Sequence, residues 1–313
     1  MKICLVGPGI MPIPPNGWAA VESLIFDYYL VLTQLGHEVK IVNTPDRDKI
    51  IQEVNSFEAD VVHLEYDVFY ELLPRFNTKL VCISSHYPYI DQLDKHRMDN
   101  YSPIFRYMIE NCNRFPIFAI SEKDRNTFIN WGANPNKVIF RPNGANPQRF
   151  KYCPQPNNPC ASITLAKIDP QRKRQYLTKE IRSVHYVGRG PYNHTNYLGE
   201  WTDEQKFNNL THFANSVLLS TGENGTPLCL KESLICGLGI VCTAQAASEL
   251  DDKKPWITVV DDRCINDVNH LDSVIAYNRS ISLKHRDEIR EYGMQWDWAK
   301  LVPKYVENLK SLI

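Results

Sequence analysis

Lysines and arginines gather between residues 166 and 175, in the stretch "AKIDPQRKRQ". Lys167 and Lys173 are six positions apart there, and Arg172 and Arg174 flank the second lysine. Cations that directly follow a strand can neutralise a diphosphate, including one that departs as a leaving group. The plain alternative is a solvated run of charge. The apolar run just before the stretch favours phosphate binding.

A second stretch, residues 220–239, reads "STGENGTPLCLKESLICGLG". It is a polar loop, broken by glycines, that continues into a helix of small residues. Glu223 and Glu232 bracket the loop, and Asn224 lies between them. Backbone N–H groups of such a loop can hold phosphate where the helix begins. A Gly-Pro turn before a core helix is the alternative, but it does not explain Glu232 beside so many small residues.

The loop at residues 7–22, "GPGIMPIPPNGWAAVE", also joins an apolar run to a helical pattern. Pro12 occupies the position where the third glycine of a dinucleotide fingerprint would be, so we do not infer an NAD site. Gly17 and the two alanines that follow residue 18 let the backbone approach a ligand at the start of the helix. Because the loop is long and rich in proline, we favour ligand binding over a plain connection.

The elements that would position these residues follow from an alternation of apolar runs and helical patterns. Strand–helix–strand order of this kind implies a parallel sheet. Residues 151–160, "KYCPQPNNPC", hold three prolines and indicate a linker between two such α/β units. Strands are expected at 2–6, 38–43, 60–65, 79–84, 116–120 and 137–141 before the linker, and at 162–166, 184–187, 195–199, 215–219, 239–243 and 256–260 after it.

Length and composition are those of a globular protein with two domains. The chain has 313 residues, of which 43% are hydrophobic and 23% charged, and its net charge of −1 provides no overall basic field for nucleic acid. The nine cysteines include no CxxC pair, which favours free core thiols over disulfides or a zinc site. With no signal-peptide pattern and no apolar run of about 18 residues, we expect a cytoplasmic protein.

The segment "PPNGWAAVESLIFDYYLVLTQLGHEV" (residues 14–39) resembles the opening of family 4 glycosyltransferases of the GT-B fold. Gly17, Trp18 and Glu22 match the family's Gly-aromatic-Gly-Gly-x-Glu, although Ala19 and Ala20 replace two glycines and leave less room for an acceptor or phosphate. The resemblance implies an α/β protein with two Rossmann-like domains whose parallel sheets face each other across a cleft. The implied domains are 1–152 for the acceptor and 153–294 for the nucleotide-sugar, with the C-terminal helix at 295–313 packing back on the first.

Further segments agree with the family. "ADVVHLEY" (residues 59–66) resembles a strand end of the family, and we interpret its His63 as a core residue. "SSHYPY" (residues 84–89) places His86 where the family has a histidine near the donor sugar. In the second domain, Lys167 and Lys173 match the two basic residues that the family uses at the diphosphate. Gly188, in "HYVGRGP", matches a glycine turn beside the nucleotide.

The family also carries two glutamates with seven residues between them. Glu232 matches the second, which contacts the nucleotide ribose, and counting back places Asn224, not Glu223, where the first contacts the sugar hydroxyls. An asparagine can still hydrogen-bond a hydroxyl, but it carries no charge. The implied catalytic residues are His86, Lys167, Lys173 and Glu232, and the implied donor-binding residues are Gly17, Trp18, Gly188, Glu223, Asn224, Gly225, Thr226, Pro227, Leu228 and Cys229.

The resemblance implies a retaining hexosyl- or pentosyltransferase that uses a UDP- or GDP-linked donor, with no cofactor and no metal. The acceptor would be a hydroxyl of a glycan, a glycolipid or a modified nucleobase, and the near-neutral charge argues against duplex DNA. Two alternatives stay open: a nucleotide-sugar epimerase or hydrolase of the same fold, and a catalytically weak sugar-nucleotide binder. Donor turnover without acceptor would indicate hydrolysis, and binding without turnover would indicate the binder.

Overall fold

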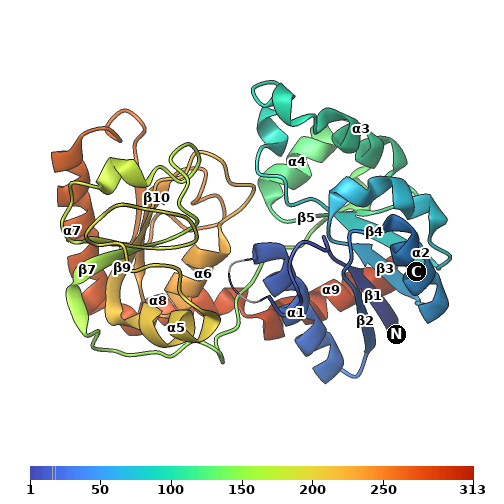
Figure 1. The fold of residues 1–313 in the computed structure, drawn as a ribbon, viewed down its shortest axis with the longest axis horizontal. Coiled ribbons are helices and arrows are strands. Elements are labelled where there is room, and N and C mark those ends of the chain that lie inside the picture. Colours follow the sequence, from blue (N-terminus) through green and yellow to red (C-terminus); the bar gives the residue numbers. More distant parts are fainter. Residues whose placement is uncertain (16, 18) are drawn as a thin grey trace. The chain divides into compact units, whose positions relative to one another are not determined.

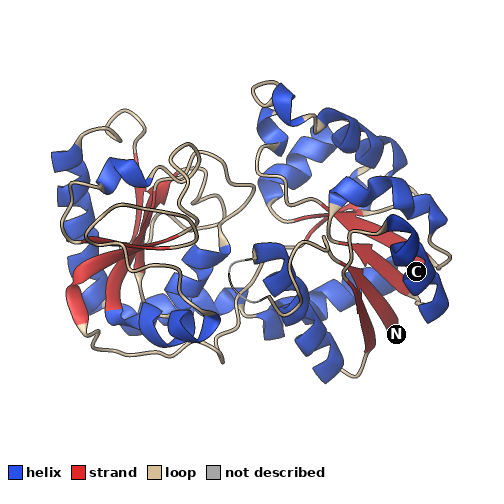
Figure 2. Cartoon of the chain, viewed as in Figure 1, coloured by secondary structure: helices blue, strands red, loops and turns tan. Residues whose placement is uncertain are grey.

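The computed structural model describes residues 1–15, 17 and 19–313, so the predicted donor-binding residue Trp18 lies outside the described residues. The chain forms two compact units (Figure 1). Unit 1 comprises Met1–Asn143 and Trp298–Ile313, and unit 2 comprises Gly144–Asp297. In each unit helices flank a sheet of parallel strands (Figure 2), which confirms the predicted α/β class.

In unit 1 the described residues form a six-stranded sheet in the order β2-β1-β3-β4-β5-β6. All neighbouring strands pair in parallel, as the strand–helix–strand pattern predicted. The strands are β1 Lys2–Val6, β2 Glu38–Val42, β3 Val61–Leu64, β4 Leu80–Ser84, β5 Ile117–Ala119 and β6 Val138–Phe140.

Apolar residues on both faces of this sheet explain why helices cover it on both sides. Cys4 and Val6 of β1 point into one core, and the alternate residues Ile3 and Leu5 point into another, because successive side chains of a strand face opposite ways. Helices α1 and α9 contact each other and enclose the second core (Figure 1). The helices of unit 1 are α1 Ala20–Gln34, α2 Arg47–Phe57, α3 Ser102–Asn111, α4 Glu122–Asn130 and α9 Trp298–Leu312.

Unit 2 contains a five-stranded parallel sheet among its described residues, in the order β11-β10-β9-β7-β8. Its two faces are covered by α6 and α8 on one side and by α7 on the other. The strands are β7 Asn158–Leu165, β8 Val184–Val187, β9 Phe213–Leu218, β10 Gly239–Thr243 and β11 Ile257–Val260, and the helices are α5 Asp203–Asn209, α6 Leu228–Ile235, α7 Val268–Lys284 and α8 Arg286–Gly293.

The strand predicted at 195–199 is wrong. Tyr197 makes only an isolated bridge with Tyr186 of β8. The segment lies beside β8, since the Leu198 amide donates to Tyr186 O at 2.9 Å and the Asn196 side chain donates to Val184 O at 3.1 Å, but Gly199 takes a φ of +83° and no strand forms. An apolar pair within a run of turn-forming residues was therefore not enough to make a strand.

The boundary between the units falls before the proline-rich segment 151–160. Ala145 already belongs to unit 2, because its amide donates to Trp296 O at 2.9 Å and it pairs with Asp297 in an isolated bridge. Strand β7 then begins inside the proline-rich segment. At the other end of unit 2, Trp296 is buried in that unit's core, whereas Trp298 is buried in the core of unit 1.

When the strands are renumbered within each unit, the first five strands follow the same order, 2-1-3-4-5, in both sheets, and unit 1 adds a sixth strand at the end. The order reverses between β1 and β3 in unit 1 and between β7 and β9 in unit 2. Ligands of open α/β sheets bind at such a reversal, beyond the carboxyl ends of the strands. The fold therefore directs attention to the loops after β7 and β9, which are the two stretches that the sequence singled out.

The nine cysteines have free thiols, as predicted. None of the described helices combines the length and apolar character that a membrane-spanning helix needs.

Candidate active site

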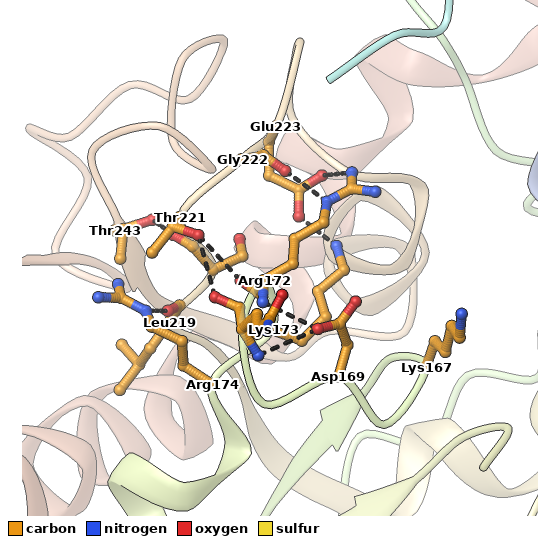
Figure 3. A network of polar contacts seen from close by, with 12 residues as sticks. Lys167, Asp169, Arg172, Lys173, Arg174, Leu219, Thr221, Gly222, Glu223 and Thr243 are labelled. Carbon is orange, nitrogen blue, oxygen red and sulfur yellow. Dashed lines mark hydrogen bonds and ion pairs between the residues drawn. The ribbon is translucent and has the colours of Figure 1, made fainter. Parts of the chain in front are cut away.

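Two cations and one carboxylate meet in unit 2 beyond the carboxyl ends of β7 and β9 (Figure 3). Lys173 Nζ contacts Glu223 Oε1, and Arg172 Nη2 lies 3.2 Å from Glu223 Oε2. Arg172 Nε also donates to Gly222 O at 2.8 Å. Glu223 is only 5% exposed, so these ion pairs are shielded from solvent. The sequence indicated the two cations, but not that Glu223 holds them.

The loop that carries the two cations has a fixed backbone. Asp169 Oδ1 accepts from the Arg172 amide at 2.9 Å, and the Asp169 carbonyl accepts from the Lys173 amide at 2.8 Å. The Thr221 amide, in the segment after β9, donates to Arg172 O at 2.9 Å. The positions of both cations are therefore set by the two loops at the strand reversal.

Lys167, which was predicted to act at the same phosphates, stands apart from this cluster (Figure 3). Its side chain is exposed. Gln175 Nε2 donates to Lys167 O at 2.8 Å, which fixes the backbone and not the ammonium group. The structure thus brings Lys173 and Arg172 together without Lys167, whose role at the phosphates stays a prediction.

Helix α6 begins at Leu228, after Pro227, with no side-chain cap. Within the described chain the amides of Leu228 and Cys229 have no acceptor. A helix N-terminus with unpaired N–H groups and the positive end of the helix dipole suits phosphate. The Thr226 amide is already bonded, because it donates to Glu249 Oε2 at 3.0 Å. Among the residues predicted to line the phosphates, Leu228 and Cys229 therefore offer N–H groups and Thr226 does not.

Glu249 is a residue of this site that sequence reasoning missed. Its Oε2 also accepts from Lys231 Nζ at 2.7 Å, and the Lys231 side chain is fully buried. Burial lowers the pKa of Lys231, and the Glu249 carboxylate opposes that effect. The Glu249 amide donates to Thr226 Oγ1 at 3.1 Å, so the loops after β9 and β10 are joined. No local sequence pattern indicates this pair, because its partners lie on different elements.

Glu232, the predicted ribose ligand, has an unpredicted partner in Lys206 of α5. Lys206 Nζ lies 2.8 Å from Glu232 Oε1, and both side chains are largely buried. Burial alone would lower the pKa of Lys206, but the Glu232 carboxylate reverses this effect and the pKa lies above its ordinary value. One oxygen of Glu232 is therefore engaged by the Lys206 ammonium group.

The Cys229 thiol, in the first turn of α6, lies within electrostatic range of the charged side chains described above. Burial raises the pKa of Cys229 to about 12; the charges of Lys173 and Lys206 oppose this increase, and those of Glu232 and Glu223 add to it. All four charged side chains therefore lie near the first turn of α6. The structure brings together the predicted residues Lys173, Glu223, Cys229 and Glu232.

Asn224 lies at the position predicted to face the donor sugar. Its Nδ2 is buried and makes no hydrogen bond to any described residue. Ser220 Oγ, Gln245 Oε1 and Glu249 Oε1, in the loops after β9 and β10, are buried and unpaired in the same sense. Buried polar atoms are nearly always paired in folded proteins, so an accumulation of unpaired ones is typical of a place where a polar ligand binds.

Gly188 has a packing reason to be glycine. A Cβ at this position would come within 1.7 Å of Ala166 O. The backbones beyond β7 and β8 run against each other here, and the Ile168 amide donates to Arg189 O at 2.9 Å. The predicted contact of Gly188 with the nucleotide stays a prediction beside this structural requirement.

In unit 1 the loop after β1 is fixed by side chains of neighbouring elements. Asn43 Oδ1 accepts from the Gly9 amide at 2.8 Å, and Glu22 Oε1 accepts from the Met11 amide at 3.2 Å. Gly17 has a φ of +115°, a conformation that favours glycine. Glu22, which matches the family's glutamate, is thus bonded to the backbone of its own loop.

His86 follows β4, and its Nε2 lies 3.3 Å from Glu65 Oε2. Glu65 follows β3 and is fully buried, and Arg141 Nη1 and Nη2 each donate to it at 2.7 Å. Burial alone would raise the pKa of Glu65, but the Arg141 guanidinium outweighs burial and holds that pKa well below its usual range. His86 therefore faces a charged carboxylate, and its contact with a sugar stays a prediction.

His63 is a core residue, as the sequence indicated. It is fully buried, with Nδ1 2.8 Å from Tyr305 Oη and Nε2 2.9 Å from Ser84 Oγ. Burial lowers the pKa of His63 to about 3, so the folded chain keeps this imidazole neutral.

This shift predicts a loss of stability in mild acid. His63 is protonated near pH 6.5 in the unfolded chain but not in the folded chain. The contribution of neutral His63 to the free energy of unfolding is therefore fully present above that pH, and it falls by up to about 1.4 kcal/mol per pH unit towards pH 3. Hydrogen exchange of the β3 amides at pH 7.0 and 5.5 should show the free energy of opening falling by about 1 kcal/mol more in wild type than in His63→Gln. Equal losses in the two proteins would contradict a neutral His63.

Neither a protein-family model nor a curated protein sequence matches the chain. Solved structures do. AviGT4, a glycosyltransferase involved in avilamycin A biosynthesis, has a TM-score of 0.72 and 14% identity over 99% of this chain and 97% of that chain. HepE of Anabaena, solved with UDP-glucose, has a TM-score of 0.70 and 15% identity over 99% and 100% of the two chains.

Sucrose-phosphate synthase from Thermosynechococcus elongatus has a TM-score of 0.74 and 12% identity over 100% of this chain and 99% of that chain. At such identities the likeness is one of fold. The parallel sheets, their strand order and this likeness agree, and the chain has the two-unit α/β fold of the GT-B glycosyltransferases.

Proposed function

We propose that the chain transfers a sugar from a nucleoside-diphosphate donor to a hydroxyl acceptor, with retention of configuration and without a metal ion. The observation that carries the proposal is the pair of anion-binding features around Cys229 in unit 2. One is the Arg172–Lys173 cluster, and the other is the set of unpaired amides at the start of α6. Side-chain charge and helix N–H groups both bind phosphate, and a diphosphate has enough oxygens for both.

The structural neighbours support a uridine diphosphate donor. HepE of Anabaena has been solved with UDP-glucose, with UDP, and with UDP and glucose. In this chain the unpaired atoms of Asn224, Gln245 and Ser220 are suited to sugar hydroxyls, because they include both donors and acceptors. Glu232 Oε2 is the oxygen that we assign to the ribose, since Lys206 engages Oε1.

In the proposed reaction the bond between sugar C1 and the β-phosphate oxygen breaks, and a bond between C1 and the acceptor oxygen forms on the same face. The departing diphosphate gains negative charge, which Arg172 and Lys173 stabilise in place of a metal. A β-phosphate oxygen takes the acceptor's proton. The acceptor is a hydroxyl of a glycan, a glycolipid or a modified nucleobase.

Thermal unfolding with nucleotides tests this proposal. UDP, GDP, UDP-glucose and GDP-mannose are added separately, and one of the donors should raise the Tm. A ligand at a hundred times its Kd adds about 2.7 kcal/mol, which corresponds to about 5–10 °C for a unit of this size. The stabilising donor is then incubated with and without acceptor sugars, and free nucleotide is measured. Absence of any Tm shift would overturn the proposal, and equal nucleotide release without acceptor would replace transfer by hydrolysis.

A further inference from the structure

Glu223 is one position out of register with the glutamate that would contact a donor sugar, and the structure shows what it contacts instead. Its two carboxylate oxygens are engaged by two different cations, Oε1 by Lys173 and Oε2 by Arg172 (Figure 3). The spacing of the two glutamates does not decide whether Glu223 reaches the sugar in place of Asn224. The ion pairs favour a different role, because a cation engages each carboxylate oxygen and the side chain is only 6% exposed, which leaves little access for a sugar hydroxyl.

The exposure of the three side chains shows which way the cluster faces. The Glu223 side chain is 6% exposed, Lys173 is 14% exposed and Arg172 is 33% exposed. The cations thus have more access to solvent than the carboxylate that holds them. Within the described chain, Arg172 Nη1 and the remaining Lys173 protons have no acceptor, so donors are left for an incoming anion.

The net charge of the cluster sets how tightly it would hold a diphosphate. Two cations and one carboxylate leave a net charge of +1 at the cluster, whereas the cations alone would carry +2. A bare +2 site would hold a diphosphate more tightly, both before and after reaction, and binding that is equally strong in the ground state does not speed the chemical step. A buried counter-ion instead aligns the cations in advance and lowers the affinity for the free product.

We propose that Glu223 is a positioning residue for an anion site formed by Arg172 and Lys173: it fixes the direction of both cations and weakens the hold on the released diphosphate. Asn224 keeps the position that faces the sugar. The identity of the natural anion, a nucleoside diphosphate, rests on the proposed function. The anion site itself does not, so inorganic pyrophosphate is the probe.

Isothermal titration with inorganic pyrophosphate tests the site in wild type, Glu223→Gln and Glu223→Asp. Glutamine has nearly the same shape but no charge, so Glu223→Gln should bind pyrophosphate about 5–20-fold more tightly at low salt, with a smaller gain at about 0.5 M salt. Aspartate keeps the charge, so its Kd should stay within about threefold of wild type. Glu180→Gln is the matched control, because the exposed Glu180 pairs with Lys179 at 3.8 Å and is not part of the cluster; its Kd should stay within about twofold.

Turnover and sugar binding provide the second readout. With the donor found by thermal unfolding, Glu223→Gln should lower kcat about tenfold or more while UDP and UDP-sugar affinities both rise. If Glu223→Gln changed the affinity for the UDP-sugar but not for UDP, Glu223 would contact the sugar and the proposal would be overturned. A pyrophosphate affinity that is unchanged or weaker in Glu223→Gln would also overturn it. Tighter pyrophosphate binding in that variant, together with a protein that no nucleotide stabilises, would leave this inference standing and the proposed function overturned.

Discussion

Replacing Lys173 with alanine should lower kcat about 10²–10³-fold, which is the usual effect of removing one preorganised charge from a developing oxyanion. Lys173 lies in the cluster that we propose stabilises the departing diphosphate, and charge develops there only as the sugar–phosphate bond breaks. UDP affinity should fall less, by about tenfold, because Arg172 and the α6 amides remain. Steady-state kinetics of nucleotide release, combined with UDP titration, separate the two effects.

Lys179→Ala is the control for this change. Lys179 follows the same loop, but it is exposed, and its one ion pair among the described residues is with its neighbour Glu180 at 3.8 Å, so kcat should stay within about twofold. If Lys173→Ala raised KM and left kcat unchanged, the lysine would contribute equally to the ground state and the transition state. Its assignment to the leaving group would then be wrong.

Replacing Arg141 with methionine should destabilise unit 1 by about 3–5 kcal/mol, the usual cost of removing one partner of a buried ion pair. Glu65 would remain fully buried without the two 2.7 Å contacts that now compensate its charge. Arg141 Nη2 also donates to Ser84 Oγ at 3.0 Å, so β4 loses a contact as well. Because the chain has two units, hydrogen exchange of the β3 and β4 amides is the appropriate measurement.

Arg75→Met provides the matched arginine control in the same unit. Arg75 and Asp48 form an exposed pair at 3.5 Å, and its loss should cost less than about 1 kcal/mol. Changing Glu65 and Arg141 together to methionine should cost less than Arg141→Met alone, since no uncompensated charge is left in the core. A double variant as unstable as the single one would show that the charge of Glu65 is not the cause.

Much of the fold follows from local pattern. The runs at 2–6, 80–84 and 239–243 became strands because all but one residue of each is non-polar, as is typical of strands covered on both faces. The segment 195–199 was misassigned because Tyr197 and Leu198 have side chains typical of a strand. The positive φ of Gly199 ends the extended backbone after a single bridge. Residues 144–152 belong to unit 2, although the prediction placed them in the first domain, because the amides of Ala145 and Lys151 donate to partners far along the chain.

The candidate site also has a part that local sequence indicated and a part that it did not. Spacing singled out Lys173 and Glu232 as candidates, because both belong to short segments with a fixed relation to a strand or helix. Their partners could not be predicted, since Lys206 lies 26 residues from Glu232 and Lys173 lies 50 residues from Glu223. Lys173 and Glu223 meet only once the sheet has brought the ends of β7 and β9 together, and Lys206 and Glu232 meet only once α5 and α6 lie side by side.

The C-terminal helix α9 gives the chain an unusual order of assembly during translation. Trp298, Val302 and Leu309 fill the core of unit 1, and Tyr305 bonds His63 of β3, yet all of unit 2 lies between this helix and the rest of unit 1. A ribosome therefore delivers the first 143 residues long before it delivers the helix that completes their core. Domains usually fold in the order in which they are made. Here unit 2 is the first to have its whole sequence, and in the nascent unit 1 the second core is covered by α1 alone until α9 has been made.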